Sequence, residues 1–284
     1  MRVVAGERLK LFPGIPILWG DNASFTSRCV GVGGRFGQKM EESAYIMEAI
    51  AGVILLIVGV RLYLLSRQNG HAPEYFLALM FVVWALGYAL YDIPYAFTEG
   101  DESIAPFFAF SSLLAINLGN VFLALFTRGV FRREQRWAGW LVVAIAVCLV
   151  LGSAGTAWVG DWQQADPLAN PGYWPQIVGG FAPAVWMGVE GLAHYASARK
   201  RLKIGLCAPL TCHHFLLWGL AGALWSILEI VIVVQDFIYL SAGDWSGALG
   251  IVNGALEIAP ITLMWLVFFA PAGYRRWIEG ATPA

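Results

Sequence analysis

Long apolar stretches separated by short polar segments make up most of the chain. Seven such runs, each of 22–25 residues, can be read at 44–66, 74–97, 104–127, 138–159, 174–197, 211–235 and 248–270. A helix of this length extends roughly 33–37 Å, which is enough to cross a hydrocarbon core of about 30 Å. Backbone groups inside a bilayer must bond within their own segment, and the short alternating strands of a membrane barrel do not occur in the sequence. The pattern therefore predicts an all-α polytopic membrane protein, a seven-transmembrane-helix bundle with its membrane domain at 43–272.

Basic residues beyond residue 60 fall only in or beside alternate gaps between these runs. They are Arg61, Arg67, Arg128, Arg132, Arg133, Arg136, Arg199, Lys200, Arg201, Lys203, Arg275 and Arg276. The remaining gaps hold no Lys or Arg and carry Glu99, Asp101, Glu102, Asp161, Asp166 and Asp244. Because cytoplasmic loops carry the positive excess, this distribution predicts that the N-terminus lies outside and the C-terminus in the cytoplasm.

Composition supports the same class of protein. The chain is 58% hydrophobic and only 13% charged, which excludes an ordinary soluble domain. A content low in Lys and rich in Ala, Gly and Trp favours a bacterial inner membrane, so we expect a multi-pass protein of the cell (cytoplasmic) membrane whose main partner is the lipid bilayer. The basic residues are too few and too divided for nucleic acid to be a partner.

Both ends of the chain differ from the membrane domain. Residues 1–42 are rich in Gly and polar residues, and their six Lys and Arg would lie outside, against the rule that the other loops follow. Our interpretation is that this tail is disordered and that translation of the native protein begins at Met40 or Met47. Residues 273–284 are predicted to form a short cytoplasmic tail without an output domain, so a receptor of this kind would signal through a separate membrane or cytoplasmic partner protein.

Four carboxylates lie in the outer half of the predicted runs. They are Glu48, Asp92, Glu229 and Glu257. Ionisable groups at this depth are costly, and by default they indicate a functional site. Neighbours at helical spacing complete the candidate ligand- or cation-binding set: Tyr88, Tyr91, Tyr95, Trp218, Trp225 and Asn253. Pro260 also deprives the carbonyl of Leu256, beside Glu257, of its helical donor.

No Lys or Arg lies at the depth of these carboxylates on any run. Four carboxylates that converge in a medium of low dielectric cannot all stay ionised, so we expect at least one to hold a proton at neutral pH or a cation to compensate them. The competing interpretation is structural. In that case Glu48 and Asp92 reach the headgroups, while Glu229 and Glu257 hydrogen-bond between helices.

A second polar layer lies near the predicted cytoplasmic ends of the fifth and sixth runs. It consists of Glu190, His194, His213 and His214. A carboxylate with histidines has suitable chemistry for a transition metal. His213 and His214 are adjacent, however, so they point about 100° apart on a helix and cannot both readily face one ion. Solvated or hydrogen-bonded histidines are therefore the favoured interpretation, and a metal site is the alternative.

Three functions remain open at this point. The first is a receptor-like or sensory protein that binds a small, cationic ligand in an outward-opening acidic and aromatic cavity, because carboxylates and aromatic faces together suit amines. The second is a proton- or cation-coupled transporter that uses the same carboxylates and a pathway past Asn117 and Asn120, which we expect to bond across the middle of the bundle. The third, least favoured, is a metal-dependent intramembrane enzyme built on the second polar layer.

A retinal pigment is excluded because its Schiff base needs a lysine in the last helix. The only lysines are Lys10, Lys39, Lys200 and Lys203, and none of them lies within a predicted run. We therefore expect no cofactor.

Overall fold

A computed structural model describes residues 34–70, 72–97, 105–159, 170–242 and 246–280. The chain divides into two compact units, residues 1–39 and 40–284, and the second of these holds nearly all of the described residues. The side chains of residues 34–48, 91–97, 105–106, 238–242 and 246–251 lie outside the described part, although their backbone is helical. The predicted disorder of residues 1–33 lies outside it as well.

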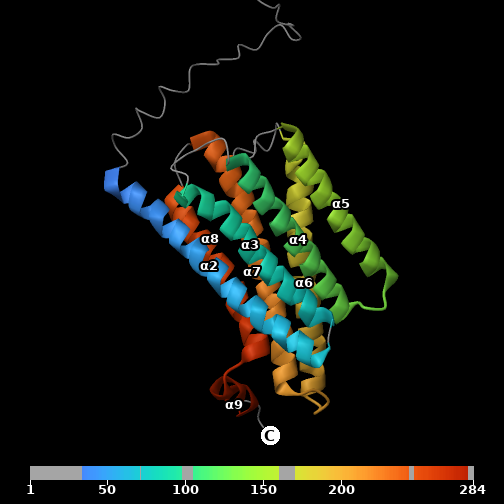
Figure 1. The fold of residues 1–284 in the computed structure, drawn as a ribbon. Helices are drawn as coiled ribbons and strands as arrows, with labels where there is room; N and C mark the ends of the chain where they lie inside the picture. Colours follow the sequence, from blue (N-terminus) through green and yellow to red (C-terminus); the bar gives the residue numbers. More distant parts are fainter. Residues whose placement is uncertain (1–33, 71, 98–104, 160–169, 243–245, 281–284) are drawn as a thin grey trace, which may run out of the picture. The chain divides into compact units, whose positions relative to one another are not determined.

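All regular elements of the described residues are helices (Figure 1). They are α2 (Gly34–Asn69), α3 (Ala72–Phe97), α4 (Ala105–Phe131), α5 (Arg136–Val159), α6 (Tyr173–Leu202), α7 (Pro209–Ala242), α8 (Ser246–Phe269) and α9 (Ala272–Gly280). Each predicted apolar run coincides with one helix from α2 to α8. Three features differ from expectation: α2 begins at Gly34, inside the predicted tail, α7 continues to Ala242, and the predicted C-terminal tail contains α9.

Six of these helices are long and apolar enough to cross a membrane. They are α2, α3, α4, α5, α7 and α8, judged over the part of the chain that the structure describes. The prediction of an integral membrane protein with several spans is thereby supported, while the seventh span stays a prediction. Length is not the reason that α6 falls short, because its 30 residues extend about 45 Å. Its composition is the reason, since glycines, Pro183, Glu190 and a basic last turn dilute the apolar residues.

Within residues 40–284 the helices pack in a closed order. The α3 helix packs on α4, α4 on α5 and α6, α5 on α6, α6 on α7, and α7 on α8 and α9. The α2 helix closes the ring: a Cβ at Gly59 would lie 3.0 Å from Cβ of Phe81 in α3. On its other side, the guanidinium carbon of Arg61 lies 4.8 Å from the ring centroid of Phe269 in α8. We call the end of the bundle that carries Arg67, Arg128 and Arg199 the basic end, and the opposite end the acidic end.

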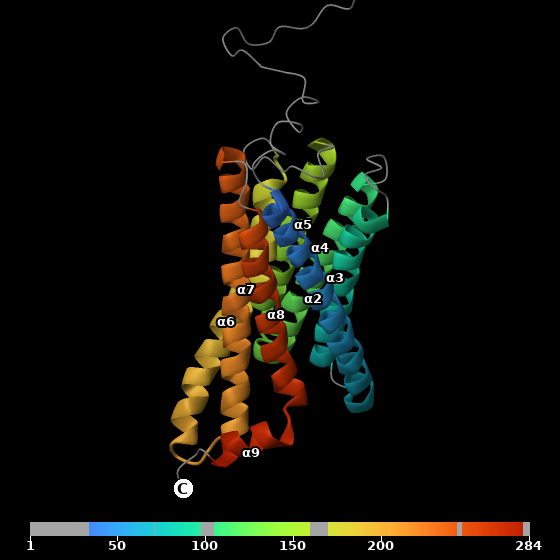
Figure 2. The ribbon, with the colours of Figure 1, turned by 90° about the vertical axis from the view of Figure 1, so that its left-hand side faces the viewer.

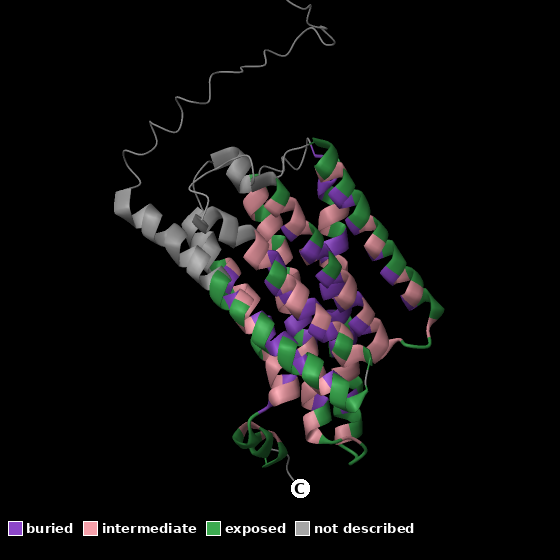
Figure 3. Ribbon diagram, viewed as in Figure 1, coloured by how far each residue is buried: buried purple, intermediate pink, exposed green. Residues whose placement is uncertain are grey.

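Buried residues gather where these helices face one another, as the colouring of the ribbon in Figure 3 shows. The main core cluster includes Leu55 and Leu62 from α2, Phe81 from α3 and Met187 from α6. The outer surfaces are apolar as well: Val143, Val147, Val150 and Leu151 of α5 are all exposed. Apolar surface on both sides of a helix is typical of a lipid-facing bundle.

The α6 and α7 helices approach each other closely, and glycines permit this approach. A Cβ at Gly191 would lie 2.5 Å from the backbone nitrogen of Gly219, and one at Gly188 would lie 3.2 Å from the backbone nitrogen of Ala223. Small residues of this kind bring backbones together in membrane bundles. The packing places the glycines of α6 directly against the backbone of α7.

Helix α9 lies across the basic end of residues 40–284, beside the start of α7 (Figure 2). Its Tyr274 is hydrogen-bonded to Nε2 of His213 in α7. Burial raises the pKa of Tyr274, so its hydroxyl keeps its proton at neutral pH. This bond fixes α9 to the first turn of α7.

Candidate functional site

Two tryptophans, one from α3 and one from α7, meet in the interior of the bundle. The rings of Trp84 in α3 and Trp225 in α7 are edge to face, with centroids 5.2 Å apart. Nε1 of Trp84 donates to the main-chain oxygen of Ile116 in α4 at 3.1 Å, which fixes the orientation of its ring. The pair forms an aromatic wall on one side of the carboxylate layer described next.

The first carboxylate of this layer belongs to Glu257 in α8. The hydroxyl of Tyr88, one turn along α3 from Trp84, donates to Oε1 of Glu257 at 3.0 Å. Pro260 lies inside α8, so the carbonyl of Leu256 lacks its helical donor. A carboxylate, a phenol and a carbonyl without a helical donor therefore lie together at this level of the bundle.

The second carboxylate belongs to Glu229, one turn along α7 from Trp225. A Cβ at Gly180 would lie 3.5 Å from Oε1 of Glu229 and 3.6 Å from Nδ2 of Asn120, so these three residues of α7, α6 and α4 converge. Pro183 in α6 deprives the carbonyl of Gly179 of its helical donor. A carboxylate and a carbonyl without a helical donor thus lie together around Glu229 as well, with an amide in place of the phenol.

The two carboxylates lie in one layer. Successive helices of the bundle alternate in direction, so α3 and α7 both run from the basic end to the acidic end. Tyr88 and Glu229 each follow a member of the tryptophan pair by four residues, which places both one turn beyond the tryptophans. We call Trp84, Tyr88, Trp225, Glu229 and Glu257 the central site.

Further polar pairs lie between the central site and the acidic end. Nδ2 of Asn253 donates to Oε1 of Gln235 at 2.7 Å, which joins α8 to α7. The hydroxyl of Tyr173 in α6 donates to a carboxylate oxygen of Asp236 at 2.8 Å. Asp236 was missed in the sequence because the predicted run ends at residue 235. Together these pairs extend the polar interior from the central site towards the acidic end.

The predicted outer layer is only partly assembled by the described side chains. The structure brings Tyr88 to Glu257 and places Trp225 one turn from Glu229, while the side chains of four predicted members lie outside the described part: Glu48, Tyr91, Asp92 and Tyr95. Trp218 lies elsewhere, seven residues towards the basic end from Trp225, in an aromatic cluster with Phe126, Phe131, Phe215 and Phe268. Its position on the same helical stripe was correct, but about 10 Å of helix separates it from Trp225.

Asn117 bonds across the bundle core as expected. Its Nδ2 donates to Oγ of Ser153 in α5 at 2.9 Å and to Oε1 of Gln176 in α6 at 3.0 Å. The amide of Gln176 returns a hydrogen bond to Oδ1 of Asn117. Asn117 therefore joins α4, α5 and α6, and its role is structural.

Near the basic end lies Glu190, a buried carboxylate that forms an ion pair. Only 5% of Glu190 is exposed, and its Oε1 accepts a hydrogen bond from Nε of Arg132 at 2.7 Å. Nε1 of Trp186 donates to the same oxygen at 3.3 Å. The hydrogen bond to Glu190 raises the pKa of Arg132, so the guanidinium stays charged. This pair joins the turn after α4 to α6.

The predicted metal candidates are divided among different partners. Nδ1 of His194 donates to the main-chain oxygen of Glu190 at 2.9 Å, while His213 is bonded to Tyr274. Nε2 of His214 is buried without a hydrogen-bond partner. Among the described residues, no three or more His, Cys, Asp or Glu side chains are grouped so that they could hold a metal ion. The arrangement gives no geometric support to the metal alternative.

Fold and site together define a class: a multi-pass helical membrane protein with ionisable groups enclosed in its bundle. Comparison with models of protein families, with curated proteins and with solved structures finds no match to this chain.

Proposed function

We propose that this protein binds a small cationic ligand, such as an amine, at the central site, and that it acts as a receptor-like or sensory membrane protein. The observation that carries the proposal is a pair of half-buried carboxylates, Glu257 and Glu229, about one helical turn from two tryptophans whose rings meet edge to face. Glu257 and Glu229 supply negative charge, and the faces of Trp84 and Trp225 supply the aromatic surfaces that attract cations. An ionisable side chain at membrane depth lowers the stability of the protein, so its presence indicates a functional site.

The arrangement of partners supports a ligand with both charge and apolar surface. Tyr88 holds one carboxylate in a fixed orientation, and Asn120 lies beside the other. A site with a few well-placed polar groups and aromatic walls suits small organic molecules more than a bare ion. The carbonyls at Gly179 and Leu256 offer two further acceptors for an ammonium group.

The proposal includes seven membrane spans, with α6 as the seventh and with the acidic end outside. Support comes from the length of α6 and from its packing on α4, α5 and α7, which are themselves long and apolar enough to cross. The separation of Lys and Arg from the acidic loops supports the orientation. A cationic ligand would then approach from the acidic side.

A second candidate function is cation- or proton-coupled transport. It is favoured by the polar pairs that lead from the acidic end to the central site, Tyr173 with Asp236 and Asn253 with Gln235. Transport also requires an exit pathway for the cation at the basic end, where the Arg132–Glu190 pair lies. Uptake into proteoliposomes under an imposed pH gradient would distinguish a transporter from a receptor.

The first test is a thermal-unfolding screen of the detergent-purified protein with small amines. Choline and its uncharged carbon isostere make an informative pair, because they differ in charge at nearly constant shape. A ligand at about 100 times its Kd adds roughly 2.7 kcal/mol to the stability of the protein that binds it. We expect stabilisation by a charged compound and none by its neutral isostere.

Variants locate the effect at the central site. Glu257→Gln and Glu229→Gln should each abolish most of the stabilisation, while Glu279→Gln, the same change on exposed α9, should leave it intact. If no cation stabilises the wild-type protein selectively, or if all three variants respond alike, the proposed function is wrong.

A further inference from the structure

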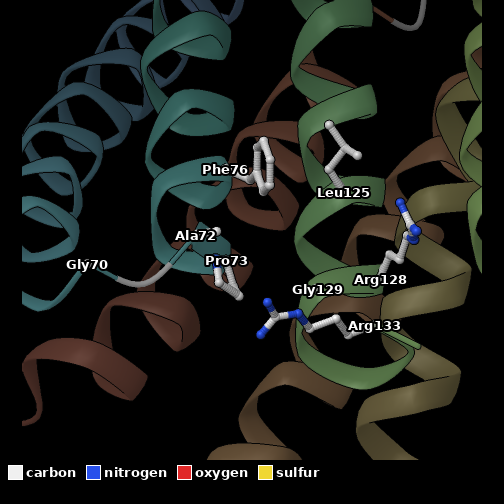
Figure 4. Close-up of a pocket in the computed structure, with 8 residues that line it drawn as sticks. All are labelled: Gly70, Ala72, Pro73, Phe76, Leu125, Arg128, Gly129 and Arg133. Carbon is white, nitrogen blue, oxygen red and sulfur yellow. The ribbon is translucent and has the colours of Figure 1, made fainter. Parts of the chain in front are cut away.

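A pocket separate from the central site lies at the basic end between α3 and α4 (Figure 4). Its volume is about 460 Å³. The lining comes from the end of α2, the first turns of α3, the last turns of α4 and the turn that follows, and consists of Gly70, Ala72, Pro73, Phe76, Leu125, Arg128, Gly129 and Arg133.

The pocket has one directed charge. Figure 4 shows the guanidinium of Arg133 pointing from the turn after α4 towards Pro73 at the start of α3. The neighbouring Arg132 is already paired with Glu190, so the two arginines of this turn have different tasks. Glu74, in the first turn of α3, is not among the lining residues. The charged side chains that line the pocket are therefore both positive.

Arg128 adds a second positive charge in the wall. Its guanidinium points away from Pro73 in Figure 4, and a Cβ at Gly139 of α5 would lie 3.5 Å from its Cζ. Nε of Arg128 is buried without a hydrogen-bond partner. Arg128 as a whole is half-buried, and an anion in the adjacent pocket would compensate its charge and could accept from this nitrogen.

The remaining walls are of two kinds. Phe76 and Leu125 present apolar surface along the length of α3 and α4. Ala72 and Pro73 belong to the first turn of α3, whose unsatisfied N–H groups carry partial positive charge. An occupant with an anionic head and an apolar body would satisfy both kinds of wall.

We propose that this pocket binds the phosphate headgroup of an anionic phospholipid. Arg133 holds the phosphate, Arg128 contributes to the attraction, and the upper part of the lipid lies along Phe76 and Leu125. The pocket is at the helix ends that carry the Lys and Arg, which is the level of the anionic headgroups of a cytoplasmic leaflet. Guanidinium groups suit phosphate because they donate two parallel hydrogen bonds. The assignment does not depend on the ligand of the central site.

The test uses the full chain in a neutral detergent, titrated with phosphatidylglycerol, with phosphatidylcholine and with inorganic phosphate. The shift of the thermal unfolding midpoint against concentration gives an apparent affinity for each. Arg133→Gln is compared with Arg136→Gln, which removes the same charge from an exposed position three residues past Arg133, the last residue of the lining. Arg133→Lys tests whether a point charge is sufficient.

We expect phosphatidylglycerol to stabilise the wild-type protein more than phosphatidylcholine does. Arg133→Gln should bind it roughly fivefold more weakly, the change that corresponds to the loss of one arginine near an anionic surface, and Arg136→Gln should bind it as the wild type does. Equal losses in both variants would show diffuse attraction to a basic surface and overturn the site. Equal stabilisation by phosphatidylcholine would overturn the role of the anionic headgroup, and equal stabilisation by inorganic phosphate would assign the pocket to the free anion instead of the lipid.

Discussion

At the scale of single residues, the Arg132–Glu190 pair shows how a buried carboxylate depends on the side chain that compensates its charge. Glu190 is almost fully buried, while about a third of the Arg132 side chain is exposed. A carboxylate taken out of water is stable only when a partner compensates its charge. Arg132 is therefore needed mainly because Glu190 is present.

This leads to a prediction about stability. Arg132→Met should lower the free energy of unfolding by about 3 kcal/mol, near the lower end of the range for a broken buried pair, because Arg132 is itself partly exposed. The double variant Arg132→Met with Glu190→Leu should recover most of that loss, since no buried charge then remains. Reversible unfolding in mixed micelles measures both. The matched control is Arg136→Met at an exposed position, and a control as unstable as Arg132→Met would contradict the argument.

Local spacing explains which parts of the site the sequence could reveal. Tyr88 and Glu257 were identified because each stands at membrane depth, and Glu190 with His194 because they are one turn apart. The partnership of Glu190 with Arg132 joins residues 58 positions apart, and no periodicity predicts it. Trp218 shows the same limit, because one helical stripe can pass through two separate clusters.

At the scale of elements, α6 combines an interior position with an unusually polar composition. Eleven of its residues are buried, and several of these are glycines that lie against α7. The side of α6 that packs on α4, α5 and α7 needs small residues more than large apolar ones, while its other side exposes Trp174, Val178 and Val189. The sequence did not predict the glycine contacts with α7, because the role of a glycine in packing is seen only when the opposing backbone is known.

The close approach of α6 and α7 can be tested directly. Gly191→Ala places a Cβ 2.5 Å from a backbone nitrogen of α7 that cannot move alone, so the helices must separate. We expect a loss of about 1–3 kcal/mol in the free energy of unfolding, the usual cost of overpacking. Gly273→Ala has open space around its Cβ and should be neutral or slightly stabilising. The idea fails if Gly191→Ala is as stable as the wild type in detergent unfolding.

At the scale of the whole molecule, the apolar runs predicted the helices well, because the boundaries of α3 to α8 agree with them within a few residues, apart from a longer end of α7. Six helices of the described chain are long and apolar enough to cross a membrane, while the seventh span and the orientation stay predictions. Lipid solvation acts on every residue of a span, so the signal is strong even in one sequence. The enclosed groups give a weaker signal because their partners come from other helices. The spans could therefore be predicted from one sequence. The central site could be predicted only in part, because its residues find their partners on other helices.

The seven-span topology can be measured with single cysteines in a background without native cysteines. Trp174→Cys lies at the start of α6 and Lys203→Cys directly after its end. We expect a membrane-impermeant thiol reagent to label Trp174→Cys in intact cells and Lys203→Cys only after permeabilisation. Labelling of both from the same side would show that α6 does not cross, and the inverse labelling would reverse the orientation.

The central claim is that the two carboxylates beside the tryptophan pair bind a cation, and calorimetric titration of the best stabilising amine tests it most directly. The account predicts binding to one site per chain in the wild-type protein, with at least about tenfold weaker binding in Glu257→Gln and Glu229→Gln, the scale of one lost charge-assisted hydrogen bond. Glu279→Gln should bind as the wild type does. Unchanged affinity in both carboxylate variants would contradict the account, because the enclosed charges would then serve only to hold the helices together.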